Sequence, residues 1–393
     1  MKAIMPCCVL LTCFLCSCST VNVKSAQVVS IEKEQGDIAE AELLDIGIKI
    51  FNPGLENANE IDEENIIFPE IRLAEASYFP YILMDTIQSS SAWGAVRVVP
   101  QDHQWVDVTV NGKIIVSDGK SLTLAISVYD AAGNHWFSKQ YTHDASMYSY
   151  KEKTVQKKEP FQSLYNQIAN DLNQHRKQLT ANQRVNLRAI SQLRFAAAIS
   201  PTMFADHIKK NQTGQYTIQR LPAENDPMVT RVQQLKERDH LFIDTLQQYY
   251  DSYVKEMQRP YHQWRSESYR EVMAMDKLKR QAFNEKAAGA LAIIAGILGV
   301  GKSDASVRAA GSLAVTAGAY IVKSGYDRDA DAQIHIETLQ ELGDSLETSI
   351  APHVIELDDR TITLTGTVNN QYSQWRKILH EIYQVNTGGI KQK

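Results

Sequence analysis

The stretches VDVTVNGKIIV (residues 106–116) and SLTLAISVY (residues 121–129) decide the fold. Each alternates apolar and polar residues with the period of two that is typical of a β-strand with one buried face. We expect turns at Asn111-Gly112 and at Ser117-Asp118-Gly119, because both contain residues that favour tight reversals. The same kind of pattern predicts further strands over residues 44–51, 95–100 and 135–141.

Helical spacing flanks these strands. Apolar residues recur every three to four positions over residues 69–89, and Pro80 is expected to kink or divide this helix. A second helix is predicted over residues 160–179. The order of strand, helix, several strands and helix predicts an α+β sandwich over residues 41–179, with helices on one side of a mixed sheet.

Three segments of this domain carry a family resemblance: WGAVRVV (residues 93–99), VTVNGKI (108–114) and ISVYD (126–130). Through them, residues 42–178 resemble the domain shared by the curli-secretion lipoprotein, the outer-membrane activator of penicillin-binding proteins and the amino-terminal part of TolB. Such domains are envelope-assembly and partner-binding modules. The resemblance therefore implies contact with envelope proteins rather than catalysis, without identifying the partner.

The amino terminus predicts export. All five cysteines lie within the first eighteen residues, around an apolar stretch that follows Lys2. Leu15-Cys16-Ser17-Cys18 resembles the lipobox of bacterial lipoproteins, which implies that residues 1–17 are a cleaved lipoprotein signal peptide and that Cys18 carries the lipid. Ser19 follows, and the absence of Asp there implies a periplasm-facing place at the outer membrane. A weaker match ending at Cys13 and a plain secretory signal are the alternatives. Residues 18–40 are polar and predict a flexible tether.

Charge and residue types exclude several functions. The formal net charge of −5 disfavours a nucleic-acid-binding protein, since such proteins usually carry a basic surface. A chain cleaved before Cys18 keeps no free thiol, so we expect neither a disulfide nor a catalytic cysteine. No two histidines have the spacing of a helical metal site, and no G-x-S-x-G motif is present. We therefore expect no metal, no cofactor and no enzyme activity.

Residues 180–286 predict a helical stalk. The helical pattern is broken at Pro201, around residues 211–214, and at Pro222 and Pro227. Residues 228–256 and 261–286 are two long, charged stretches with a narrow apolar stripe. Such a stripe is typical of a helix that packs on a neighbouring helix, so the expected shape is coiled-coil-like.

Residues 287–325 resemble a glycine zipper. Two uncharged apolar stretches, 287–301 and 309–322, lie on either side of the polar residues 302–308 and predict a helical hairpin. Glycines seven positions apart share a helix face and allow helices to approach closely. The expected helix-packing or oligomer contacts are Gly289, Gly296, Gly299, Gly311, Gly318 and Gly325. A hairpin buried in the protein, one inserted part-way into a membrane and the core of a homo-oligomer all remain open.

The same segment contains GILGVGKS (residues 296–303), which fits the phosphate-binding pattern G-x-x-x-x-G-K-[ST]. A nucleotide site of this kind needs a buried strand before the loop, whereas residues 290–295 favour a helix. Too few residues follow to complete the sheet of such a domain. We therefore expect no bound nucleotide.

Residues 326–393 predict a small carboxy-terminal α/β piece. A helix is expected over 334–350, two strands over 353–357 and 361–368, and a last helix over 371–383. The run TITLTGTV (residues 361–368) resembles the strand of BON modules, which are associated with envelope and phospholipid attachment.

These patterns together predict a lipid-anchored, non-catalytic lipoprotein that serves as an assembly, scaffold or partner-binding factor at the outer membrane. Its expected partners are the membrane and envelope proteins, with no nucleic acid. A periplasmic peptidoglycan-active hydrolase and a secretion or pore subunit are the alternatives.

Overall fold

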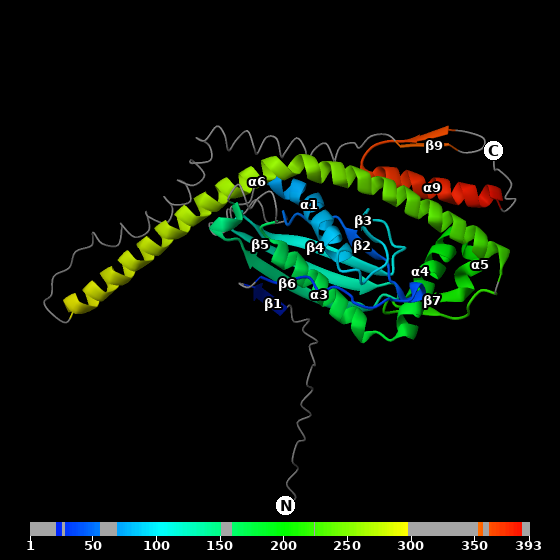
Figure 1. Cartoon of the computed structure of the whole chain (residues 1–393), viewed down its shortest axis with the longest axis horizontal. Coiled ribbons are helices and arrows are strands. Elements are labelled where there is room, and N and C mark those ends of the chain that lie inside the picture. Colours follow the sequence, from blue (N-terminus) through cyan, green and yellow to red (C-terminus); the bar gives the residue numbers. More distant parts are fainter. Residues whose placement is uncertain are drawn as a thin grey trace, which may run out of the picture.

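The computed structural model describes residues 21–25, 28–55, 69–150, 159–223, 225–297, 353–356 and 361–386. A six-stranded sheet lies at the centre of these residues. One helix, α6 (Pro227–Ile297), crosses the molecule beside the sheet and continues past its end (Figure 1). The helix predicted over 334–350 and the second arm of the predicted hairpin lie outside the described residues.

The sheet is mixed and has the strand order β1-β6-β5-β4-β2-β3. Its antiparallel part consists of β4 (Val108–Ser117), β5 (Ser121–Asp130) and β6 (His135–Asp144). In its parallel part, β2 (Ile46–Lys49) pairs with both β4 and β3 (Val96–Val99), and β1 (Val21–Ser25) pairs with β6. The strands predicted over residues 44–141 and the predicted α+β class are confirmed.

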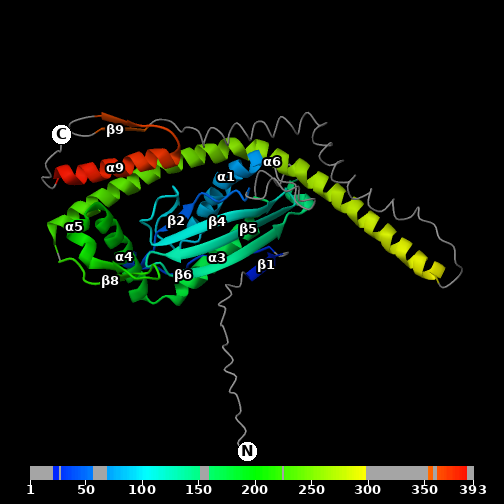
Figure 2. The same ribbon diagram turned by 180° about the vertical axis from the view of Figure 1, so that it is seen from behind.

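Helices cover one face of this sheet. On β5 the side chains of Leu122, Leu124, Ile126 and Val128 are fully buried, whereas Tyr129, on the other face, is 39% exposed. The covering helices are α1 (Pro69–Gln88) and α3 (Gln162–Gln178), and in Figure 2 strands β4 to β6 lie in front of α3. The period-two pattern of the strands therefore corresponds to one covered and one open face.

The turn expected at Asn111-Gly112 is wrong, because β4 runs through both residues and pairs Gly112 with Ile126. The glycine is needed for packing instead. A Cβ atom at Gly112 would lie 2.4 Å from ring carbons of Phe51, so only a residue without a side chain leaves room for this buried ring. Close approach of an aromatic ring and a tight turn both select glycine, and the sequence alone does not separate them.

Pro80 does not divide α1, which runs unbroken through it. A proline cannot donate the helix hydrogen bond to the carbonyl four residues earlier, which here belongs to Ala76. That carbonyl accepts a hydrogen bond from the backbone N–H of Phe51 at 3.0 Å. The helix thus continues because the chain after β2 satisfies the group that the proline leaves unpaired.

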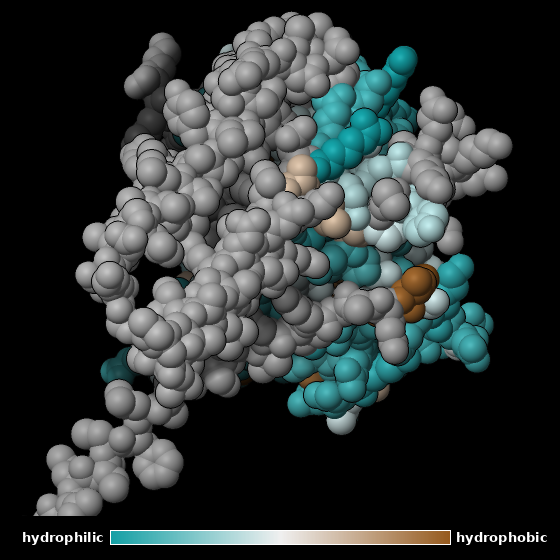
Figure 3. Space-filling model, turned by 90° about the vertical axis from the view of Figure 1, so that its left-hand side faces the viewer, coloured by the Kyte–Doolittle hydropathy of each residue, from teal (hydrophilic) through white to brown (hydrophobic). Residues whose placement is uncertain are grey.

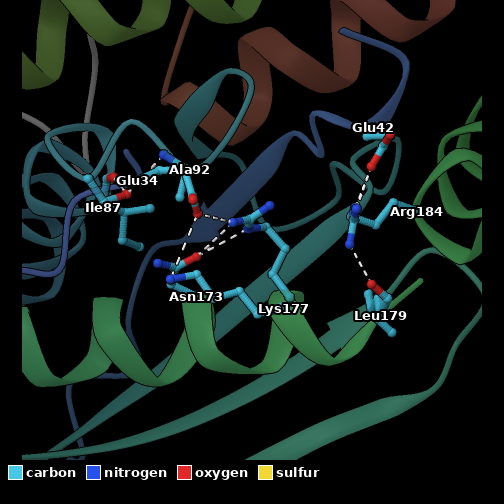
Figure 4. A network of polar contacts seen from close by, with 10 residues as sticks. Glu34, Glu42, Ile87, Ala92, Asn173, Lys177, Leu179 and Arg184 are labelled. Carbon is cyan, nitrogen blue, oxygen red and sulfur yellow. Dashed lines mark hydrogen bonds and ion pairs between the residues drawn. The ribbon is translucent and has the colours of Figure 1, made fainter. Parts of the chain in front are cut away.

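The second half of the expected tether (18–40) lies against the domain, which corrects that expectation. The backbone N–H of Glu34 donates to the carbonyl of Ser90 at 2.9 Å, and the Glu34 carboxylate accepts from Arg176 on α3 at 2.5 Å. Figure 4 shows Glu34 beside Asn173 of α3, and Glu42 in an ion pair with Arg184. Arg176 thus holds this polar segment at Glu34, and Arg184 holds the chain just beyond it at Glu42.

The region predicted as all helix begins with α4 (Ala181–Ile199), which starts with a capping box between Thr180 and Gln183. A short α5 (Pro201–Phe204) follows. A hairpin of β7 (Ile208–Lys210) and β8 (Tyr216–Ile218) was not expected, since three-residue strands leave almost no periodic signal. Its turn coincides with the predicted break at residues 211–214. Short 3-10 helices η1 (Glu40–Glu42), η2 (Met147–Tyr150) and η3 (Ala205–His207) complete the connections.

The carboxy-terminal strands β9 (His353–Glu356) and β10 (Thr361–Leu364) pair antiparallel and precede α9 (Val368–Asn386), which confirms these predicted elements. Two hydrophobic clusters support the fold. One fills the space between the sheet, α1 and α3, and the other joins α4, α9 and the start of α6. Because α6 supplies residues such as Tyr261 to the first and Leu246 to the second, it connects the two.

Candidate functional site

The candidate functional site is α6 together with the contacts that fix it to the domain. The sequence pattern predicts two stretches of a stalk, residues 228–256 and 261–286, but these form one helix that runs through Pro260 and joins the first apolar arm up to Ile297. Up to about Val272 the helix buries side chains against the domain, among them Tyr253, Tyr261 and Trp264. This part therefore packs on the domain and is not a free stalk.

The first anchoring contact closes the edge of the sheet. Gln247 of α6 donates from Nε2 to the carbonyl of Val98 at 2.8 Å, and its Oε1 accepts from the N–H of Val98 at 2.9 Å. The side-chain amide thus bonds β3 on the side where no strand pairs with it, which protects an otherwise open edge. Beside it, Arg97 donates to both carboxylate oxygens of Asp244 at 2.5 and 3.0 Å.

The second contact is a group of buried polar side chains between α1, α3 and α6. We call it the buried cluster; its members are Arg72, Glu75, Glu159, Tyr261 and Arg265. The Tyr261 hydroxyl donates to Oε1 of Glu75 at 2.6 Å. Arg265 donates to both oxygens of Glu159, at 2.5 and 3.1 Å. Two arginines and two carboxyl groups thus lie together, which lowers the cost of burying a charge.

The two carboxylates of the buried cluster differ in electrostatics. Burial raises the pKa of Glu75, and the opposing effects of Arg72, Ser117 and Tyr261 do not offset it. Burial also acts on Glu159, but the charge and hydrogen bonds of Arg265 outweigh it, so the pKa of Glu159 is lowered. Glu159 is therefore a firm ion-pair partner, whereas Glu75 holds a proton more readily than an ordinary glutamate.

The buried cluster is closed to substrates. Arg72 is 3% exposed, and Glu75 and the Arg265 side chain are 0% exposed. Within the described part of the chain, Nη1 of Arg72 and Oε2 of Glu75 have no hydrogen-bond partner, which makes this half of the cluster energetically costly. Buried charges that must pair favour one position of a helix over shifted ones. We infer that the cluster determines where α6 lies.

A third contact fixes the start of α6 to α9. The indole Nε1 of Trp375 donates to Oδ1 of Asp239 at 3.2 Å, and Oδ2 of Asp239 lies 3.3 Å from Nε2 of His103. Phe242 stacks on the Trp375 ring with centroids 5.2 Å apart. Asp239 is 0% and His103 2% exposed, so this His–Asp pair has no access to a substrate and serves to dock α9.

The distal part of α6 leaves the domain. Near this point Asp276 forms an ion pair with Lys120, at the end of the sheet. Helix continues from there to Ile297, which adds about 30 Å at 1.5 Å per residue. Figure 1 shows this segment in yellow, projecting from the body of the molecule.

The structure places only some of the expected site residues. Gly289 and Gly296 lie on the projecting helix, seven residues apart, as the glycine-zipper pattern requires. Cys18, Gly299, Gly311, Gly318 and Gly325 lie outside the described residues. Residues 290–295 are helical, so the segment before the phosphate-loop pattern is not the strand that a nucleotide site needs, as expected.

The buried cluster is not predicted by the sequence patterns. One signal was present, because Glu75 lies within the apolar stripe of α1, between Ile71 and Tyr78. A charged residue on the buried face of a helix requires a partner. The sequence does not reveal that this partner network includes Tyr261 and Arg265, almost two hundred residues away.

The described surface at the end from which α6 projects is mostly hydrophilic, with isolated hydrophobic residues (Figure 3). Among the described residues, no helix is apolar over a length that could cross a membrane. The described part of the chain also holds no group of three or more potential metal ligands. No family model, curated protein or solved structure matches this chain.

Proposed function

We propose that this protein is a lipid-anchored lipoprotein of the outer membrane, facing the periplasm, and that it acts without catalysis as an assembly, scaffold or partner-binding factor. The observation that carries the proposal is the two-part construction of α6. Its first part is fixed to the α+β domain by buried polar contacts, and its second part projects with a regular pair of glycines. Such a helix presents a contact surface at a fixed distance from the domain.

The chemistry of the projecting segment supports association. Glycine in a water-exposed helix costs about 1 kcal/mol relative to alanine, so two glycines on one face need a compensating contact. Close packing with another helix supplies that contact. The lipobox ending at Cys18 supports the envelope location, and the resemblance to envelope-assembly domains supports a protein partner.

Cysteine cross-linking tests this function. Gly289→Cys and Gly296→Cys place a thiol on the glycine face, and Leu291→Cys places one on the opposite face as a matched control. The proposal reserves Cys18 for the lipid, so each variant carries one reactive thiol. In membranes treated with a mild oxidant or a thiol cross-linker, we expect both glycine-face variants to give a product of higher mass and the control to give little.

The mass of the product identifies the partner as a second copy or another envelope protein. Equal cross-linking of all three variants, or none, would refute an association through the glycine face.

The lipid anchor is tested separately. Cys18→Ala is expected to release the protein from membranes into the soluble periplasmic fraction. Retention of the variant in the membrane would contradict the lipid anchor.

A further inference from the structure

A pocket of about 540 Å³ lies between α4, α9 and the loop before β4, and no contact of the anchored helix uses it. Its volume is in the range of roughly 300–1,000 Å³ that small-molecule sites occupy. Its apolar lining consists of the partly exposed Trp105 and Ala198 and of Phe195, Ile199 and Leu379, which are almost fully buried. The Trp105 and Phe195 rings meet edge to face with centroids 5.8 Å apart, so this lining is well packed.

The rest of the pocket lining is polar and contains two cations. Ser373, Arg376, Lys377 and His380 recur at helical spacing on one face of α9 and line the pocket. Arg376 and Lys377 are exposed, and neither forms an ion pair with a carboxylate among the described residues. The Arg376 guanidinium lies 5.8 Å from the Trp105 ring centroid, so cationic and apolar lining residues adjoin.

We propose that this pocket binds a single acyl chain with an anionic head group. The chain packs against Trp105 and Ala198, and the carboxylate or phosphate bonds to Arg376 and Lys377. A small hydrophilic anion makes no contact with the apolar part of the lining, and an uncharged chain forms no ion pair with the two exposed cations. Only a ligand with both an apolar chain and an anionic group complements the apolar and the cationic lining residues. The proposal concerns a different surface from the projecting helix and stands independently of the proposed function.

Calorimetric titration of the delipidated full-length protein tests it. The anionic probes are palmitate and a palmitoyl lysophosphatidylglycerol, which represent the free-acid and the phospholipid source, both used below their micelle concentrations. Hexadecanol and hexadecyltrimethylammonium carry the same chain with a neutral and a cationic head. We expect saturable binding of at least one anionic probe, and the tighter of the two identifies the source.

The chain and the head group contribute separately. Shortening the fatty acid is expected to raise Kd about four-fold per methylene removed. The double variant Arg376→Gln, Lys377→Gln is expected to raise the Kd of the anionic probe at least about ten-fold. Its affinity for hexadecanol should not change. Equal affinity for all head groups, or an unchanged Kd in the double variant, would overturn the proposal.

A variant that fills the pocket distinguishes loss of the binding site from loss of folding. Ala198 lines the pocket and is exposed, so Ala198→Trp fills the pocket without disturbing the hydrophobic clusters. Gln192→Trp adds the same side chain at an exposed position of α4 that does not line the pocket. We expect Ala198→Trp to abolish binding and Gln192→Trp to leave it intact, with matching thermal unfolding. Binding that survives in Ala198→Trp would locate the ligand elsewhere and refute the site.

Discussion

The two parts of α6 are built from opposite chemistry on one continuous helix. The proximal part places aromatic and charged side chains, such as Tyr261 and Arg265, into the domain. The distal part, beyond Asp276, ends in a run without charge in which Gly289 and Gly296 share a face. In the proximal part large side chains secure position, whereas small residues in the distal part leave room for another helix. Changes to the proximal part should therefore alter stability, and changes to the distal part should alter association alone.

The largest expected effect is at Arg265. Replacing it by leucine leaves Glu159 buried and without its ion-pair partner, which should lower the free energy of unfolding by about 3–5 kcal/mol. Urea unfolding followed by circular dichroism measures this change. Arg259→Ala, at an exposed position of the same helix, should stay within about 0.5 kcal/mol of the wild type. Similar values for both variants would mean that the buried cluster does not hold α6.

A smaller effect is expected at the edge of the sheet. Gln247→Ala removes both hydrogen bonds to the backbone of Val98, a fully buried residue, and should cost about 1–3 kcal/mol. The neighbouring Gln248 is exposed, and Gln248→Ala is the matched control. Hydrogen exchange at the Val98 amide should speed up in the first variant only. Unchanged exchange would show that α6 does not protect β3.

The proximal part should also respond to acid. Burial and the charge of Arg265 lower the pKa of His262 to about 4, below the ordinary value near 6.5. Between these two pH values the unfolded chain binds a proton that the folded protein does not, so the free energy of unfolding falls as the pH falls. His262→Gln should reduce this slope by up to about 1.4 kcal/mol per pH unit. Urea unfolding at several pH values measures it, and an unchanged slope would contradict the burial of a neutral His262.

The smallest expected effect on stability is in the distal part. Gly289→Ala should raise local helix stability by about 1 kcal/mol or less, while leaving the unfolding of the domain unchanged. Association should weaken, because the added methyl group separates the packed helices. Sedimentation velocity in detergent detects this, with Leu291→Ala as the control on the other face. A loss of domain stability in Gly289→Ala would contradict the claim that the distal part affects association and only the proximal part affects stability.

Local patterns in the sequence were enough to predict most of the domain. Period-two stretches gave the strands, and apolar spacing gave α1, α3 and α9. The predictions failed where one residue type serves two purposes. Gly112 accommodates the Phe51 ring instead of a turn, and Pro80 is tolerated because Phe51 bonds to Ala76. Both outcomes depend on a partner that is distant in sequence.

The anchoring of α6 could not be predicted from local sequence patterns either, because it also depends on residues that are distant in sequence. A thin apolar stripe over residues 228–256 fits a stalk and a packed helix equally well. What decides between them is the set of groups on α1 and β3 that α6 bonds to, such as Glu75 and Val98. The two glycines of the distal part were recognisable because their spacing is a property of the helix alone.

The position of strand β1 limits how far the domain could lie from a lipid anchor at Cys18. It starts at Val21 and pairs with β6, only three residues after the cysteine expected to carry the lipid. Three extended residues span roughly 10–11 Å, so the edge of the sheet would lie almost on the bilayer surface. Little chain remains for the domain to swing outward. If Cys18 carries a lipid, any contact deeper in the periplasm would depend on which way the distal end of α6 points, and the anchor would also limit orientation.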